Sequence, residues 1–176
     1  MAMASAQIEK ERDVLLAKLR QSRDRYLKLL KGVSDETAKK TPANGGWSVL
    51  QIAEHVLIAE RQMLNLWIKY AVPGKSDPAK DDAVAQGVAD RSRKDLAPES
   101  SLPKGKVLNM AQAFEQFDFY RGQTIGYVEA TEEDFRMKVV KHPLVGEIDG
   151  YQLFLLMAGH SERHAAQIEE VKSQIG

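Results

Sequence analysis

The chain has 176 residues, 43% of them hydrophobic and 28% charged, which is ordinary for a soluble globular protein with a core of its own. Its 25 basic and 25 acidic residues give a formal charge of zero, so no charge excess favours binding to nucleic acid or to an anionic membrane. Because cysteine is absent, disulfides, thiolate ligands and cysteine nucleophiles are excluded.

Neither a signal peptide nor a membrane span is expected. The N-terminal stretch becomes charged within its first residues and has no apolar signal core. No apolar run reaches the roughly 18 residues that a membrane-crossing helix needs. We therefore expect a cytoplasmic protein whose residues 1–176 form a single domain.

The first element is a long amphipathic helix, predicted over residues 4–32 from apolar side chains that recur at helical spacing. Gly32 ends that pattern, and Ser34 is the expected cap of a short helical turn that follows.

The second main helix has the clearest start in the chain. Ser48 and Gln51 match the S-x-x-Q capping box, and Trp47, just before the cap, is expected to pack on Ile52 as a hydrophobic staple. This helix is predicted to run to about Tyr70, where a Pro-Gly pair follows.

Residues 73–106 hold four of the six prolines and few large apolar side chains, which indicates a long connection with a short helix over 82–94. A third main helix is predicted over 107–130. An irregular or weakly extended stretch follows over 136–150. The last helix is predicted over about 150–174, with Asp149 as its N-cap. The pattern predicts an all-α four-helix bundle with a long crossover connection between the second and third helices.

Two of the four histidines, His160 and His164, lie four positions apart in the stretch GHSERHAAQIEE. On a helix this spacing places both rings on one face, with Cβ atoms about 5–6 Å apart, close enough to share one metal ion. Apolar residues continue the same face in both directions, so both rings are expected on or beside the inward stripe. Burying them without partners would cost about 1–3 kcal/mol each. A core hydrogen-bond network or a metal ion could supply those partners.

His55 adds a third inward histidine, on the second main helix. Three such residues on two helices favour a metal site, because bundle cores often hold metals between facing helices. Three nitrogen ligands leave coordination positions open, as in catalytic sites, and suit Zn, Ni or Fe(II). His142 precedes a proline in the irregular stretch and is expected to fix a loop.

Three stretches resemble the DinB / YfiT-like family of metal-binding four-helix bundles. They are WSVLQIAEHV (47–56), DRSRKDLAPESSLP (90–103) and HPLVGEIDGYQLFLLMAGHSERHAAQIEEVK (142–172). The resemblance implies one divalent metal held by one histidine of the second helix and two of the last, which are His55, His160 and His164. It also implies a homodimer, and it matches Gln167 to a glutamine that could hydrogen-bond to a ligand and orient it.

The family resemblance leaves the reaction open. Some relatives are thiol S-transferases that use low-molecular-weight thiols, so the ion would bind a thiol and stabilise its nucleophilic thiolate. Others are metal-dependent hydrolases, in which the ion would activate water. A non-catalytic bundle with a structural ion is the third possibility.

A hydrolase normally needs a nearby general base. Glu54, Glu60 and Asp118 are the candidates, with Asp118 the one that could face the cavity, although all three are more readily explained as solvated or ion-paired carboxylates. The lack of a convincing base ranks thiol transfer narrowly first. Four basic residues could meet an anionic thiol, but residues of this kind are usually solvated or paired: Arg91, Arg93, Lys94 and Arg163.

Overall fold

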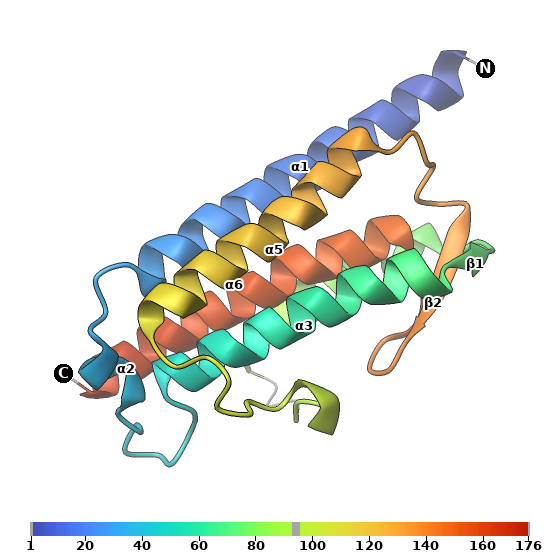
Figure 1. Ribbon diagram of the computed structural model, residues 1–176. Helices are drawn as coiled ribbons and strands as arrows, with labels where there is room; N and C mark the ends of the chain where they lie inside the picture. Colours follow the sequence, from blue (N-terminus) through green and yellow to red (C-terminus); the bar gives the residue numbers. More distant parts are fainter. Residues whose placement is uncertain (1, 93–95, 176) are drawn as a thin grey trace.

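The computed structural model describes residues 2–92 and 96–175 and is mainly helical (Figure 1). Within this part of the chain the bundle consists of α1 (Ala2–Leu30), α3 (Val49–Tyr70), α5 (Met110–Ala130) and α6 (Gly150–Ile175). Both α1 and α3 pack on α5 and α6, so the last two helices lie between the first two. The predicted all-α four-helix bundle is confirmed.

The crossover between α3 and α5 returns along the bundle, so these two helices run in the same direction (Figure 1). It contains two 3-10 turns, η1 (Pro78–Lys80) and η2 (Glu99–Ser101), and the helix α4 (Asp81–Ala89), which packs on α6. The helix predicted over 82–94 therefore exists but ends earlier. Asp90 adopts an extended backbone, and its carboxylate accepts the backbone N–H of Ser92 at 2.8 Å.

Side-chain caps start the helices where the sequence indicates them. In the short helix α2 (Asp35–Lys39), the Ser34 hydroxyl accepts the N–H of Thr37 at 3.1 Å. The capping box of Ser48 and Gln51 is complete at the start of α3. The Asp149 carboxylate accepts the N–H of a residue in the first turn of α6 at 2.9 Å, as predicted.

The start of α5 was predicted too early. The helix begins at Met110, because the Asn109 side chain accepts the N–H of Gln112 at 2.8 Å and caps it. Leu108, which lies within the predicted range of this helix, precedes its observed start and is 61% exposed.

The segment predicted as irregular or weakly extended forms a hairpin of β2 (Lys138–His142) and β3 (Gly146–Asp149). β1 (Val72–Pro73) adds a third antiparallel strand in the order β1-β2-β3. The stretch predicted as irregular or weakly extended is therefore regular antiparallel sheet over most of its length. His142 Nδ1 accepts the N–H of Leu144 at 3.3 Å inside the hairpin turn, which is the loop-fixing role expected of it.

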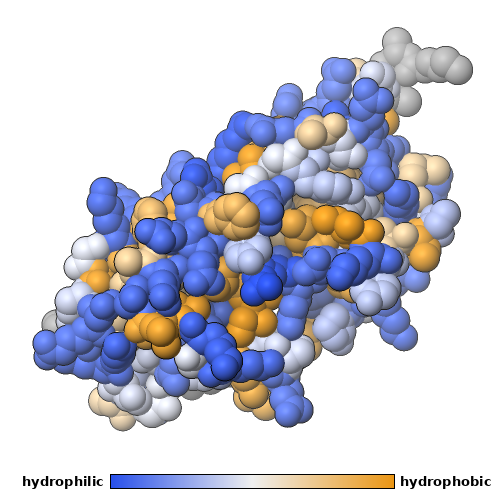
Figure 2. Space-filling view, in the orientation of Figure 1, coloured by the Kyte–Doolittle hydropathy of each residue, from blue (hydrophilic) through white to orange (hydrophobic). Residues whose placement is uncertain are grey.

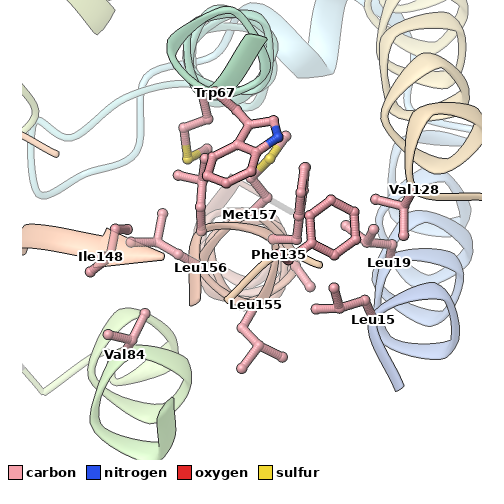
Figure 3. Packing of buried hydrophobic residues seen from close by; sticks show 14 of the residues in the cluster. Leu15, Leu19, Trp67, Val84, Val128, Phe135, Ile148, Leu155, Leu156 and Met157 are labelled. Atoms are coloured by element: carbon pink, nitrogen blue, oxygen red, sulfur yellow. The ribbon is translucent and has the colours of Figure 1, made fainter. Parts of the chain in front are cut away.

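α6 is the central helix of the half of the bundle that carries the sheet. Its residues 153–158 are all buried, as expected of a helix that is apolar on every side. Figure 3 shows Leu155, Leu156 and Met157 pointing in different directions from α6, toward side chains of the surrounding elements. Gly150 allows α6 to begin against Trp67, because a Cβ there would lie 2.6 Å from the indole ring.

The apolar residues around this part of α6 form one cluster. A buried polar layer separates them from a second apolar cluster, which includes Ile52, Phe117 and Ile168. Its centre is Arg121, whose side chain is fully buried and pairs with Glu60 through Nε–Oε1 and Nη2–Oε2 contacts of 2.7 and 2.8 Å. The remaining donors of the guanidinium bind four oxygens of α1 and α6: Leu19 O, Ser22 Oγ, Met157 O and Ser161 Oγ. One side chain therefore links all four long helices.

The outer face drawn in Figure 2 is mainly hydrophilic, with apolar residues in separate patches. Among the described residues, no helix is both long and apolar enough to cross a membrane. α1 begins at the end of the bundle where the sheet lies, and α6 ends at the opposite end, beside α2 (Figure 1).

We predict that Arg121→Ala lowers the free energy of unfolding by about 3–5 kcal/mol, because it leaves the Glu60 carboxylate buried without its cation. Urea denaturation measures the change. Arg20→Ala is the matched control: it breaks an ion pair with Glu129 in which both side chains are about half exposed, and it should cost less than about 1 kcal/mol. Equal losses in the two variants would contradict the role assigned to Arg121.

Candidate metal centre

The three predicted histidines meet between α3 and α6. His55 lies in the second turn of α3, and its Nε2 is 3.3 Å from Nε2 of His160. His164, one turn further along α6, places its Nε2 3.2 Å from the same atom. One ligand atom from each ring can be chosen so that all three lie within 4.8 Å of one another. The structure thus brings the predicted trio together, and their role as metal ligands remains a prediction.

Two of the rings are oriented by oxygen acceptors at Nδ1, the nitrogen that does not face the other histidines. Nδ1 of His55 is 2.7 Å from the carbonyl oxygen of Ser101, and Nδ1 of His164 is 2.7 Å from Oε1 of Gln167. Because these oxygens only accept, each Nδ1 carries the proton and each Nε2 presents a lone pair. The contact expected of Gln167 is therefore present.

This arrangement fits a metal ion better than a closed hydrogen-bond network. An Nε2 proton on His160 could be donated to only one of its two neighbours, which would leave the Nε2 lone pair of the other neighbour without a donor. Four-coordinate Zn with Zn–N bonds of about 2.0–2.1 Å separates its nitrogen ligands by about 3.3–3.4 Å. The two separations that involve His160, 3.2 and 3.3 Å, are close to that value, and all three ligand atoms lie within 4.8 Å of one another.

The electrostatic surroundings keep the rings neutral. Burial lowers the pKa of His164 to about 3, with smaller contributions from His55, Arg163 and Arg91 and a small opposing one from Gln167. Burial also places the pKa of His160 well below its usual range and lowers the pKa of His55. Neutral imidazole is the form that binds a metal, so the rings are ready to do so near pH 7.

One aromatic side chain, Trp47, lies beside the site. The ring of Trp47 lies 4.9 Å from that of His55. Trp47 also packs on the apolar cluster that contains Ile52, in keeping with the expected staple. From the sequence Trp47 was expected only to form the staple, although its position two helical turns before His55 gives it access to the same face of α3.

The described basic residues beside the site have hydrogen-bond or ion-pair partners. Arg163, between the two histidines of α6, donates to the carbonyl oxygens of Val88 and Asp90 at the end of α4. Arg91 pairs with Glu170. Arg93 and Lys94 lie outside the described residues.

α4 approaches α6 closely beside His160. A Cβ at Gly159 would lie 3.1 Å from the carbonyl oxygen of Ala85, so this glycine permits the approach.

The three carboxylates considered as general bases have other partners. Glu54 accepts the backbone N–H groups of Gly105 and Lys106 at 2.8 and 2.7 Å. Glu60 belongs to the buried layer around Arg121. Asp118 pairs with Arg23 of α1, with 2.6 Å between Oδ1 and Nε.

The fold and the site together define a class: helix bundles with one crossover and three histidines on two helices. Comparison with known proteins gives the family. The family model of the DinB superfamily matches residues 18–168, and the chain belongs to that superfamily.

Three relatives illustrate the similarity. YuaE of Bacillus subtilis (strain 168), an uncharacterized protein, is 31% identical over 150 residues, covering 83% of this chain and 90% of YuaE. OB0413 of Oceanobacillus iheyensis, provisionally named a metal-dependent hydrolase, is 25% identical over 137 residues, covering 78% of this chain and 71% of OB0413. The solved structure of YfiT from Bacillus subtilis, described as a probable metal-dependent hydrolase with an unusual four-helix bundle topology, superposes with a TM-score of 0.52. It is 16% identical and covers 94% of this chain and 87% of YfiT, so it supports the fold.

We predict that the metal-free protein loses stability on acidification below the usual histidine pKa of 6.5. Between about pH 6.5 and 3 the unfolded chain binds a proton at position 164 that the folded chain does not. Stability is therefore complete above this range and falls with pH inside it, by about 1.4 kcal/mol at pH 5.5 for each such histidine. Urea denaturation at pH 7.5 and 5.5 measures the loss, which should be smaller in His164→Asn. An equal loss in this variant and the wild type would count against the prediction.

Proposed function

We propose that the protein is a metal-dependent enzyme that binds one divalent ion through Nε2 of His55, His160 and His164. The observation that carries the proposal is the convergence of these nitrogens, at 3.2 and 3.3 Å, while two of the rings hold their protons on the opposite nitrogen. The donor set suits Zn, Ni or Fe(II). The descriptions of OB0413 and YfiT as metal-dependent agree with it.

The chain supplies three ring nitrogens and leaves coordination positions open for a substrate. A bound divalent ion would act there as a Lewis acid, favouring the deprotonated form of a thiol or of water. Ser101 O and Gln167 hold the rings in one orientation, and Trp47 offers an apolar surface beside His55.

The reaction proposed first is thiol S-transfer, in which the sulfur of a low-molecular-weight thiol attacks an electrophilic small molecule. The observation in its favour is that Glu54, Glu60 and Asp118 are engaged with backbone amides or arginines. A bound ion would favour ionisation of the thiol, whose proton would pass to solvent, so the attack would need no base from the chain, whereas hydrolysis normally uses one.

Hydrolysis of a small molecule is the second candidate, favoured by the names of the two relatives described as metal-dependent hydrolases. The homodimer implied by the family resemblance and the cytoplasmic location also remain predictions.

We predict that the protein, purified without a histidine tag, binds about one Zn, Ni or Fe ion per chain, and that His164→Ala abolishes this binding. Elemental mass spectrometry gives the stoichiometry. A Trp67→Phe background leaves Trp47, 4.9 Å from His55, as the only tryptophan, so quenching by added Ni²⁺ reports on the site.

His142→Ala is the matched control, because that histidine lies in the hairpin and should leave metal binding unchanged. A wild-type protein that binds no ion, or a His164→Ala variant that binds as well as the wild type, would refute the proposed centre.

We predict that the metal-loaded protein conjugates a low-molecular-weight thiol such as bacillithiol to an electrophile, and that His164→Ala and chelation remove the activity. Mass spectrometry of the conjugate provides the assay. Ester or amide hydrolysis without conjugation would favour the second candidate. A protein inactive in both screens, but with a melting temperature raised by the ion, would favour a structural ion.

A further inference from the structure

The part of the crossover that precedes α5, residues 98–106, lies against the same stretch of α3 that carries His55. Three side chains of α3 contact it. Gln62 Nε2 donates to Ser100 O at 2.9 Å, His55 Nδ1 donates to Ser101 O at 2.7 Å, and Glu54 accepts from two backbone amides further along. We call residues 98–106 the docked segment.

Glu54 makes the strongest of these contacts. Its side chain is buried, and its two carboxylate oxygens accept the consecutive N–H groups of Gly105 and Lys106 at 2.8 and 2.7 Å. Hydrogen bonds to a charged acceptor are about twice as strong as neutral ones. Gly105 has φ +69°, a left-handed conformation that lets two successive amides point at one anion.

The contact between His55 and Ser101 depends on this docking. The acceptor of this contact is a backbone carbonyl, whose position is set by the path of the chain. Ser101 O therefore reaches His55 only if the docked segment is held against α3. Glu54 precedes His55 directly, and the two side chains contact the segment at different points, residues 105–106 and residue 101. The turn η2 brings Ser101 inward, where it is buried, while Glu99 in the same turn is exposed.

We infer that Glu54 is a positioning residue of the metal centre: it docks residues 98–106 so that Ser101 O holds the proton on Nδ1 of His55. This leaves Nε2 of His55 unprotonated and aimed at His160 and His164. The effect on metal affinity rests on the proposed function, whereas the effect on the His55 proton does not.

The variant Glu54→Gln tests this, because its amide nitrogen cannot accept a backbone N–H. Gly105→Ala is a second variant that strains the left-handed backbone without touching α3, since nothing lies within 4 Å of the added Cβ. Glu99→Gln is the matched control. It makes the same chemical change, glutamate to glutamine, at an exposed position of the docked segment.

Two readouts separate positioning from general destabilisation. Long-range ¹H–¹⁵N spectra of the metal-free proteins report which nitrogen of His55 carries the proton, and Ni²⁺ titration of Trp47 fluorescence reports affinity. In the wild type and Glu99→Gln we expect the proton on Nδ1 and equal affinity. In Glu54→Gln and Gly105→Ala we expect a mixture of the two tautomers, and an affinity lower by about 10- to 100-fold, as for losses of other contacts that orient metal ligands.

If folded Glu54→Gln or, where that variant does not fold, Gly105→Ala keeps the wild-type tautomer, the inference is overturned. Wild-type affinity in either folded variant would overturn it as well. If the wild type binds no metal, the proposed function fails, and the tautomer measurement alone decides whether Glu54 positions His55.

Discussion

The burial of one arginine constrains the whole bundle. The guanidinium of Arg121 has five N–H groups and no access to water, so each must find an oxygen inside the protein. α3 supplies the Glu60 carboxylate, and α1 and α6 supply hydroxyl and carbonyl oxygens. A shift of any helix along its axis would leave donors unpaired, which is costly in an apolar interior. The layer therefore fixes the register of the four helices at one level.

This register also determines where the histidines meet. Ser161 accepts a hydrogen bond from Arg121, and His160 directly precedes it on α6. Adjacent residues of a helix point about 100° apart, so one side chain faces the buried layer while the other faces α3. On α3, Glu60 follows His55 by five residues. The same layer thus holds both ligand-bearing helices at the level where their histidines come together.

Much of the bundle was predictable because its signals are local. Ser48 with Gln51, and Asp149 with the turn after it, mark helix starts through contacts three residues apart. The hairpin was missed because its strands are short and their buried residues are consecutive, Val139 with Val140 and Ile148 with Asp149, so the sequence shows no apolar alternation. The end of α4 was also misplaced, since Asp90 stops the helix without a glycine or proline.

The histidine trio was predictable because histidine is rare in this chain and helical spacing fixes which residues share a face. The parts of the site that were missed act through partners distant in sequence. Ser101 contributes a backbone carbonyl, which every residue type has, and Arg121 looks in sequence like any charged residue of an amphipathic helix. Glu54 was considered from the sequence as a candidate general base, and nothing in the sequence indicates the amides of residues 105–106 as its partners.

The start of α1 and the end of α6 lie at different distances from the three histidines. α1 begins at the end of the bundle where the sheet lies, whereas α6 ends at the opposite end (Figure 1). Only 11 residues separate His164 from Ile175, the last residue of α6, a helical span of about 16 Å. A metal-binding group attached near the end of α6 would therefore lie within about that distance of the trio and would compete for the same ion. The same group attached at the start of α1 would lie at the opposite end of the bundle and leave the trio undisturbed.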